Sequence, residues 1–477
     1  MESRDLFKNI SPLDHRYYLA NKNLFEELSN YLSEEASTKY CVKVEAALLK
    51  THIILNSHKD KENLLKEADS LENLINPEEV YQEEEKTQHN IRALVNIIKK
   101  HVSDTIKPYI HLGATSVDIL DTATSLKIRD VTKNVVLKLL MEIEELLIDI
   151  SSREAETPQV GRTHGQHAVP ITLGFAISEY VARLGKSIIE ITNKSKDLRG
   201  KLSGAVGAYN STSLMVKNPL QMEEDTLSYL GLKPSEYSTQ LVEPEYLLRL
   251  LLEMNVAFGI IANLADDLRH LQRSEISEIK EMFTETQVGS STMPQKRNPW
   301  NSEHVKSLWK TFAPRVITFY MDQISEHQRD LTNSASQRFI ADYIAGFCAA
   351  LNRMKKVLST LYVDKDNLRK NLSFTGDLVL SEAAYILLSC AGEPDAHEKI
   401  RKITIECEKN NKKLSELLIK DKDIWDKIDS QLKKTVGINA SVFFSNPEYY
   451  RGQSVLKAKE LSKKYRSEML KIKEYIL

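Results

Sequence analysis

The feature that most constrains the fold is the length of the helical stretches between breaks. From Val136 to Ile150, apolar residues recur at steps of four, three, four and three: Val136, Leu140, Ile143, Leu147 and Ile150. This spacing predicts a helix with one apolar stripe and charged residues on its other faces. Only 16 glycines and 13 prolines occur among 477 residues, so few positions interrupt such helices. We therefore expect an all-α protein.

Four further stretches have the same character, at about 173–201, 245–279, 301–324 and 336–361. The stretch from 245 is apolar on more than one face, and such a helix must be covered on several sides. Five long helices in the middle of the chain predict an elongated bundle. Because one bundle of this length leaves wide apolar faces, we expect subunits to pack bundle against bundle.

The flanking regions differ from this central part, which predicts three domains. We expect an N-terminal helical domain at residues 1–110, where shorter helical pieces carry acidic runs. The central long-helix bundle is expected at 111–364, with a catalytic loop at 285–300. The lysine-rich residues 365–477 are expected to form a C-terminal helical domain. The bundle would then be the part that assembles into a multi-subunit helical core.

Composition excludes several function classes. Lys and Arg number 65 against 67 Asp and Glu, so no global basic field points to nucleic acid. Four scattered cysteines without a Cys-x-x-Cys pair favour a reducing compartment and argue against a disulfide framework or a zinc site. The N-terminus lacks the apolar segment of a secretory signal, and charged and amide residues interrupt the most apolar stretch at 247–264. We expect a soluble cytoplasmic protein with no nucleic-acid or membrane partner.

One segment has the composition of a chemically active loop. Residues 289–299 read GSSTMPQKRNP, in which a glycine and two prolines oppose regular helix or strand. Two adjacent hydroxyls, Ser290 and Ser291, precede two cations, including Lys296, and the amide of Asn298. Such a loop can hold an anion and move a proton. Composition alone would also fit an ordinary basic surface loop.

Histidines mark three other segments. A lone histidine is more often a satisfied core or surface residue than a catalyst, but four of the twelve, including His89 in the segment TQHN at 87–90, have unusual sequence neighbours. His111 and His164 stand beside glycine and hydroxyl residues, in loops that we expect to begin long helices. Such junctions offer free N–H donors to carboxylate or phosphate. Thr115 and Ser116 could equally cap the helix that follows them.

Two other chemistries do not fit these residues. His164 and His167 are three residues apart, but they lie in a Gly- and Pro-flanked stretch without a nearby cysteine or acidic ligand, so no metal site is predicted. A Ser-His-Asp hydrolase would need a Gly-x-Ser-x-Gly turn after a strand, and the sequence has none. No motif for an organic cofactor is found either.

Taken in chain order, the motifs resemble those of the adenylosuccinate lyase family within the fumarase/aspartase superfamily. The resemblance runs from about Ser11 to at least Arg338. The segments that carry it are SPLDHRY at 11–17, GATSVD at 113–118, RTHGQ at 162–166, GAVGAYN at 204–210, STQ at 238–240, LRHLQR at 268–273 and RDLTNS at 329–334. The loop at 289–299 marks the superfamily, whereas the histidine loop at 162–166 and the Arg-Tyr start are similar to the adenylosuccinate branch.

This resemblance implies a C–N lyase of purine biosynthesis. It would release fumarate from adenylosuccinate, giving AMP, and from the succinylaminoimidazole carboxamide ribotide, giving AICAR. In this family Ser290 would be the base and His164 the general acid, oriented by Glu303. Lys296 and Asn298 would stabilise the carbanion between the two proton transfers. A serine hydroxyl is a poor base, so we expect nearby cations and a loop that closes over substrate.

The resemblance also implies binding roles. His89 and His111 would be further active-site histidines that contact substrate phosphate or carboxylate. The implied substrate contacts are Arg16, Tyr17, Gln88, Asn90, Thr115, Ser116, Gln240, Ser291, Asn298, Arg329, Ser334 and Arg338. An arginine can bind two phosphate oxygens at once, although Arg338 could also form a surface ion pair. The family implies a homotetramer whose sites each take segments from three subunits, with no metal and no cofactor.

Some residues depart from the adenylosuccinate pattern. Gln295 follows Met-Pro as in many argininosuccinate lyases, so that enzyme or another fumarate-releasing lyase is an alternative. The other departures are Asn90, Asn333, Ala335 and Gln337. An alternative from another class is a structural member of the fold without catalysis. Retention of the serine, histidine, lysine and glutamate expected for the reaction argues against that alternative.

Overall fold

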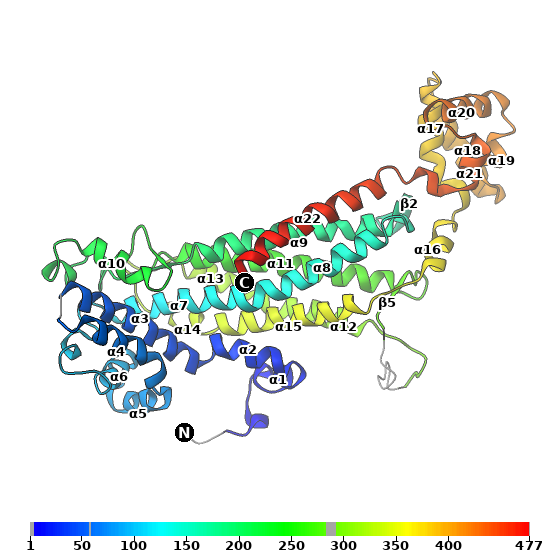
Figure 1. The fold of residues 1–477 in the computed structure, drawn as a ribbon. Helices are drawn as coiled ribbons and strands as arrows, with labels where there is room; N and C mark the ends of the chain where they lie inside the picture. The colour runs from blue at the N-terminus through cyan, green and yellow to red at the C-terminus, as the bar shows by residue number, and fades with distance from the viewer. Residues whose placement is uncertain (1–3, 57–58, 283–291, 477) are drawn as a thin grey trace.

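The computed structural model describes residues 4–56, 59–282 and 292–476, and they form an elongated, mainly helical molecule (Figure 1). The strands of the described part make three two-stranded sheets. They pair β1 (Pro158–Thr163) with β2 (Gln166–Thr172), β3 (Arg199–Gly200) with β4 (Lys233–Pro234), and β5 (Ile279–Lys280) with β6 (Tyr362–Val363). The expectation of an all-α protein is confirmed.

Long helices lie side by side along the molecular axis (Figure 1). They are α7 (Ser116–Val131), α8 (Leu137–Arg153), α9 (Leu173–Lys196), α11 (Pro244–Leu271), α12 (Trp300–Phe312), α13 (Arg315–Met321), α14 (Ser334–Arg338), α15 (Ile340–Ser359) and α22 (Ser454–Ile476). A π-helical turn at Thr132–Val136 joins α7 to α8 without a break. The largest apolar core lies between these helices. The central bundle therefore contains the largest share of the buried apolar side chains in the described residues.

The predicted stripe of α8 is the inner face of this bundle. Val136, Leu140, Ile143 and Leu147 are fully buried, and Ile150 is nearly so. They belong to the same core cluster as residues of α9, α11 and α15. Complete burial of a leucine or isoleucine side chain contributes about 1.5–3 kcal/mol.

The structure ends several helices where tertiary contacts compete with the helical pattern. Helix α11 stops at Leu271 instead of continuing to 279, because the chain turns back to place the buried carboxylate of Glu278 against Arg162 and Gln159. The stretch predicted at 301–324 is divided at Pro314, which lacks the N–H that would continue the helix. Helix α9 ends at Lys196, ahead of the β3 pairing.

Smaller groups of helices lie at the two ends of the bundle. The N-terminal group contains α3 (Glu34–Leu55), α4 (Lys61–Leu74), α5 (Pro77–Thr87) and α6 (Asn90–Ile98), and α10 (Pro219–Ser228) packs against it. The preceding helices α1 (Arg16–Ala20) and α2 (Lys22–Leu32) pack on the bundle, and Leu28 belongs to its core. Three-residue 3-10 turns occur at Leu6–Lys8, Pro12–Asp14, Lys107–Tyr109 and Thr212–Leu214. Residues of α3 to α7 form a second apolar core here.

The C-terminal group has a third core of its own. It contains α17 (Ser381–Cys390), α18 (Ala396–Asn410), α19 (Leu414–Leu418), α20 (Lys422–Thr435) and α21 (Ala440–Ser445), with 3-10 turns at Gly376–Leu380 and Pro447–Tyr450, and α16 (Lys365–Leu372) leads into it. The last helix, α22, returns to pack on α8 and α9 (Figure 1). The domain boundaries at 110 and 364 stay a prediction.

Helix α11 is long and apolar enough to cross a membrane by length and composition. It instead lies against α9 and α12 in the bundle, and Leu250, Met254, Phe258 and Ile261 are fully buried there. Its apolar character thus follows from its position between several neighbours.

Replacement of Leu147 by alanine should lower the free energy of unfolding by about 2–5 kcal/mol, since it removes a fully buried side chain and leaves a cavity. Urea denaturation followed by circular dichroism measures the change. Glu145→Ala on the exposed face of the same helix is the matched control and should change stability by less than about 0.5 kcal/mol. Equal effects of the two substitutions would contradict this account of the bundle.

Candidate active site

One group of candidate residues lies where α5, α6 and α7 meet. His89 is the N-cap of α6, and its Nδ1 accepts the N–H of Arg92 at 3.3 Å. Its Nε2 is 3.5 Å from Oγ of Ser116, the first residue of α7. The first turn of a helix presents free N–H groups and a positive dipole end, so this position suits an anion.

The residues on either side of His89 shape the turn between α5 and α6. Gln88 ends α5 in the left-handed conformation, with φ 51°, and its Nε2 donates to the carbonyl of Glu85 at 2.8 Å. Asn90 accepts the N–H of Ile91 on its side-chain oxygen at 2.7 Å. Both side chains are exposed beside His89, so these predicted contacts lie close together.

His111 is held by a buried carboxylate that sequence reasoning missed. Its Nδ1 lies 2.6 Å from Oε1 of Glu45 on α3. Burial works to lower the pKa of His111, but the hydrogen bond and charge of Glu45 outweigh it, and the pKa is raised. The other oxygen of Glu45 has no hydrogen-bond partner among the described residues. No sequence pattern points to Glu45, since 66 residues separate the pair.

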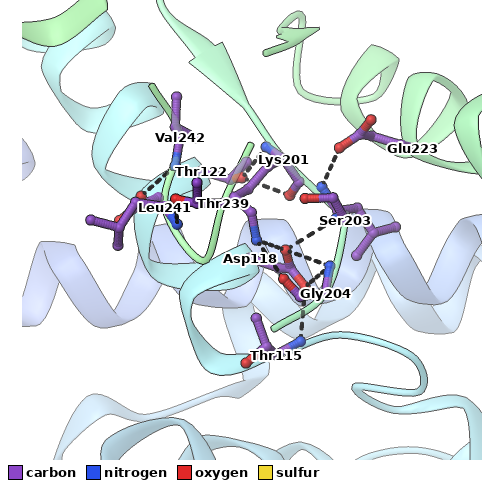
Figure 2. A network of polar contacts seen from close by, with 12 residues as sticks. Thr115, Asp118, Thr122, Lys201, Ser203, Gly204, Glu223, Thr239, Leu241 and Val242 are labelled. Atoms are coloured by element: carbon purple, nitrogen blue, oxygen red, sulfur yellow. Dashed lines mark hydrogen bonds and ion pairs between the residues drawn. The ribbon is translucent and has the colours of Figure 1, made fainter. Parts of the chain in front are cut away.

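Thr115 and Ser116 begin α7 beside a buried polar network (Figure 2). The N–H of Thr115 donates to Oδ2 of Asp118 at 2.8 Å. The same carboxylate accepts the N–H groups of Ser203 and Gly204 at 3.2–3.3 Å. The network therefore joins the start of α7 to the segment GAVGAYN at 204–210.

Gln240 lies in a loop that bridges α7 and residues 325–338. The N–H of Val242 donates to Oδ2 of Asp121 on α7 at 2.9 Å. The N–H of Gln240 donates to the carbonyl of Gln328 at 3.3 Å. The STQ segment and the RDLTNS segment, which are distant in sequence, are thus neighbours in space.

A small pocket of about 60 Å³ opens beside this loop. Its lining includes Asp121, Val242, Asn333 and Gln337. Burial raises the pKa of Asp121 to about 6. Two of the residues that depart from the family pattern, Asn333 and Gln337, therefore lie next to the Gln240 loop.

The remaining candidate residues, in the RDLTNS segment at 329–334 and in α14, come after Gln328, whose carbonyl contacts the Gln240 loop. Arg329 has a positive φ of 83°, and its Nη1 donates to the carbonyl of Gln323 and to Oγ of Ser325, both at 2.9 Å. Ser334 begins α14 and Arg338 ends it, and both are exposed. Neither side chain has a hydrogen bond to another described residue.

The β1–β2 hairpin, which carries His164, lies at the opposite end of the bundle from α3, whose Glu45 contacts His111 (Figure 1). His164 stands at the tip of the hairpin, where Thr163 pairs with Gln166. His164 and Gly165 both have positive φ, 54° and 75°, as tight hairpin turns require. The expectation that His164 directly precedes a helix is wrong, because strand β2 comes between it and α9.

The described residues after Ser291 lead into the start of α12. Lys296 is exposed and its N–H donates to the carbonyl of Met293 at 3.0 Å. Asn298 is partly buried, and Glu303 is exposed in the first turn of α12. In the part of the chain that the structure describes, Glu303 makes no hydrogen bond to His164. Ser290 and Ser291 lie outside the described residues.

Arg16 and Tyr17 lie near this region. The hydroxyl of Tyr17 is 3.0 Å from Nε2 of His304 on α12. Burial, followed by the charges of Arg353 and Arg16, lowers the pKa of His304. His304 was not among the predicted residues, and its neighbours in sequence do not distinguish it.

The continuous rod from Ser116 to Arg153 separates the two groups. At about 1.5 Å per residue, it spans about 55 Å. The residues around His111 lie at its beginning, while the hairpin of His164 follows its end. One chain therefore does not bring His164 and His111 into a common pocket.

Two family models match the chain, one described as lyase over residues 15–311 and one as adenylosuccinate lyase C-terminal over residues 325–438. The adenylosuccinate lyase of Pyrococcus abyssi is 32% identical over 87% of this chain and 90% of its own length. That of Archaeoglobus fulgidus is 33% identical over 87% of this chain and 91% of its own. The chain belongs to the adenylosuccinate lyase family.

Solved structures share the fold of this adenylosuccinate lyase family member. A fumarate lyase from Mesorhizobium superposes with a TM-score of 0.75 at 19% identity, over 92% of this chain and 97% of the other. A 3-carboxy-cis,cis-muconate lactonizing enzyme from Pseudomonas putida gives 0.76 at 21% identity, over 93% and 97%. At these identities the similarity concerns the fold alone.

In this adenylosuccinate lyase family member, replacement of Glu45 by glutamine should lower the pKa of His111, since burial, the largest influence, would then be opposed only by the smaller effect of the Asp118 charge. A histidine whose folded pKa is raised contributes stability that is fully present below its unfolded pKa and lost as pH rises through its folded pKa. The wild type should therefore have this contribution below the unfolded pKa of His111 and lose it as pH rises through the folded pKa, whereas the variant should lack it. NMR titration of the His111 ring measures the shift.

The matched control is Glu35→Gln on the same helix, whose carboxylate pairs with Lys39 at the surface. It should leave the titration of His111 unchanged. An unchanged pKa of His111 in the Glu45 variant would show that the carboxylate does not set its charge.

Proposed function

We propose that this protein is an adenylosuccinate lyase of purine biosynthesis. It releases fumarate from adenylosuccinate to give AMP, and from the succinylaminoimidazole carboxamide ribotide to give AICAR. The family match, which extends through the adenylosuccinate lyase C-terminal model, carries the proposal. The start of α7, with His89, His111 and Ser116 beside free N–H groups, supports an anionic substrate.

The reaction begins with removal of a proton from the carbon beside a substrate carboxylate. Ser290 is the proposed base, and the resulting carbanion spreads its charge into that carboxylate. Lys296 and Asn298 stabilise this charge. His164, oriented by Glu303, then protonates the departing nitrogen as the C–N bond breaks, which releases fumarate and the amino group of the nucleotide. No step uses a metal or a cofactor.

Substrate binding is assigned to residues from both ends of the bundle. His89 and His111 bind phosphate or carboxylate oxygens, and the raised pKa of His111 favours its cationic form. The other proposed contacts are Arg16, Tyr17, Gln88, Asn90, Thr115, Ser116, Gln240, Ser291, Arg329, Ser334 and Arg338. Most of the described members of this set are at least partly exposed, as a binding surface requires.

We propose a homotetramer with shared active sites, which the distance between the two groups supports. His164 and His111 are separated along a rod of about 55 Å, so the hairpin of one subunit must meet the α7 end of another. Exposed apolar side chains support association: Ile317, Tyr320 and Met321 of α13 are 60%, 54% and 64% exposed. Each site would take segments from three subunits.

The proposed location is the cytoplasm. Cys41, Cys348 and Cys407 are buried as free thiols, and Cys390 is exposed as one. Free thiols fit a reducing compartment.

The purified protein should release fumarate from adenylosuccinate and not from argininosuccinate. Absorbance of fumarate measures both reactions, and the carboxamide ribotide substrate is assayed in parallel. Turnover of argininosuccinate alone would instead favour the alternative suggested by Gln295. No turnover of any of the three by the folded tetramer would favour a structural role without catalysis.

Variants at opposite ends of the bundle should complement each other. His164→Gln and His111→Gln should each reduce kcat by about 10²–10⁴-fold, since each removes an acid-base or charge-stabilising group. Mixed tetramers, formed by partial unfolding and refolding of the two together, should regain activity, because some shared sites then contain both wild-type histidines. The assay is fumarate release before and after mixing, with refolded single variants as controls.

Light scattering shows whether the refolded mixtures are tetramers. Mixed tetramers that stay inactive would contradict the sharing of sites between subunits.

A further inference from the structure

A fully buried ion pair lies directly beneath the start of α7. The ammonium of Lys201 hydrogen-bonds to the carboxylate of Asp118, and both side chains are 0% exposed. Lys201 follows strand β3 and stands 83 residues from Asp118 in sequence. Removal of two charges from water costs more than their attraction often returns, so such a pair is weak evidence for a gain in stability. The contacts of the pair indicate a role other than stabilisation of the fold.

Contacts of the pair connect the loop after β3 to the start of α7 (Figure 2). Asp118 accepts the N–H groups of Thr115, Ser203 and Gly204. Lys201 Nζ also donates to the carbonyl of Gly204 at 3.1 Å. The backbone at 203–204 therefore contacts both charges. Its N–H groups bond to the carboxylate of Asp118, and the carbonyl of Gly204 bonds to the ammonium of Lys201.

The neighbouring hydroxyl of Thr122 extends this connection. It accepts the N–H of Lys201 at 3.0 Å and donates to the carbonyl of the same residue at 3.2 Å. The backbone of Lys201 is therefore attached to α7 one helical turn below Asp118. Both the charged group and the backbone of Lys201 are held at defined positions.

The loop held by the pair in turn supports the Gln240 loop. Gly207 has a φ of 76°, and a Cβ there would lie 1.8 Å from the carbonyl oxygen of Ser238. The 204–210 segment therefore lies directly against the backbone that precedes Gln240. From the other side, Asp121 accepts the N–H of Val242. The STQ segment is consequently enclosed between α7 and the loop that Asp118 and Lys201 hold.

We propose that Asp118 and Lys201 are positioning residues for substrate binding. Their pairing fixes the start of α7, with Thr115 and Ser116, relative to the Gln240 loop before substrate arrives. Lys201 also neutralises a carboxylate that would otherwise repel an anion at the N-terminus of α7. This inference rests on the proposed function, because it assigns substrate contacts to these two loops.

The test compares Asp118→Asn, Lys201→Met and the double variant. Each single variant leaves one buried charge unpaired and should lower the unfolding midpoint strongly. The double variant removes both charges of the pair and should be more stable than either single variant, yet it lacks the carboxylate that holds the loops. Its KM for adenylosuccinate should rise at least tenfold, while kcat stays within about threefold.

Leu147→Ala is the matched control, because it destabilises the bundle without touching either loop. It should leave KM unchanged. A double variant with the KM of the wild type would overturn the proposal, since the stability of the fold would then be the only role of the pair. Wild-type protein without lyase activity would instead contradict the proposed function.

Hydrogen exchange on the substrate-free wild type tests the pair without any activity or variant. The amides of Thr115, Ser203 and Gly204 should exchange at least a hundredfold more slowly than that of Val206 in the exposed part of the same loop. The double variant, if folded, should lose this protection while amides of α8 keep theirs. Fast exchange of the three amides in the wild type would overturn the proposal.

Discussion

Burial of the apolar stripe of α8 in the core of the bundle is the contact on which the rest of the structure depends. The buried residues of α8 pack against α9, α15 and α22, and α7 and α8 together span about 55 Å. His111 precedes one end of the rod and the hairpin of His164 follows the other. The packing that stabilises the subunit therefore also keeps the two groups of residues apart, and this separation supports the proposed sharing of sites.

Three buried carboxylates show how the surroundings of an acid decide its role. Glu45 contacts His111, and Asp118 contacts Lys201, so each faces a group that can carry positive charge. Glu144 of α8 is equally buried, but neither of its oxygens has a hydrogen-bond partner among the described residues. Burial raises the pKa of Glu144 well above its usual range, which favours the neutral acid in the core. Only the first two acids adjoin the proposed binding residues.

The periodicity of the sequence predicted the long helices, because a stripe with this period can be buried only on a helix. It did not predict the end of α11, which depends on the contact of Glu278 with Arg162 across the fold. The hairpin at His164 was also missed, since its strands are short and its turn depends on positive φ at His164 and Gly165. The motifs identified many residues that border the two ends of the bundle. Their partners Glu45 and Lys201 could not be predicted, because the pairs join distant segments.

The π-helical turn between α7 and α8 allows one rod to serve two cores. Ile119 and Ala123 of α7 belong to the N-terminal core, whereas Leu140 and Ile143 of α8 belong to that of the bundle. The extra residue of a π turn rotates the side chains that follow it by about 100° around the helix axis, relative to an uninterrupted α-helix. The π turn at Thr132–Val136 therefore determines the angle around the helix axis between the apolar face of α7 and that of α8. Relatives that lack such an insertion would have to twist one group of helices around the axis to bury the same stripes.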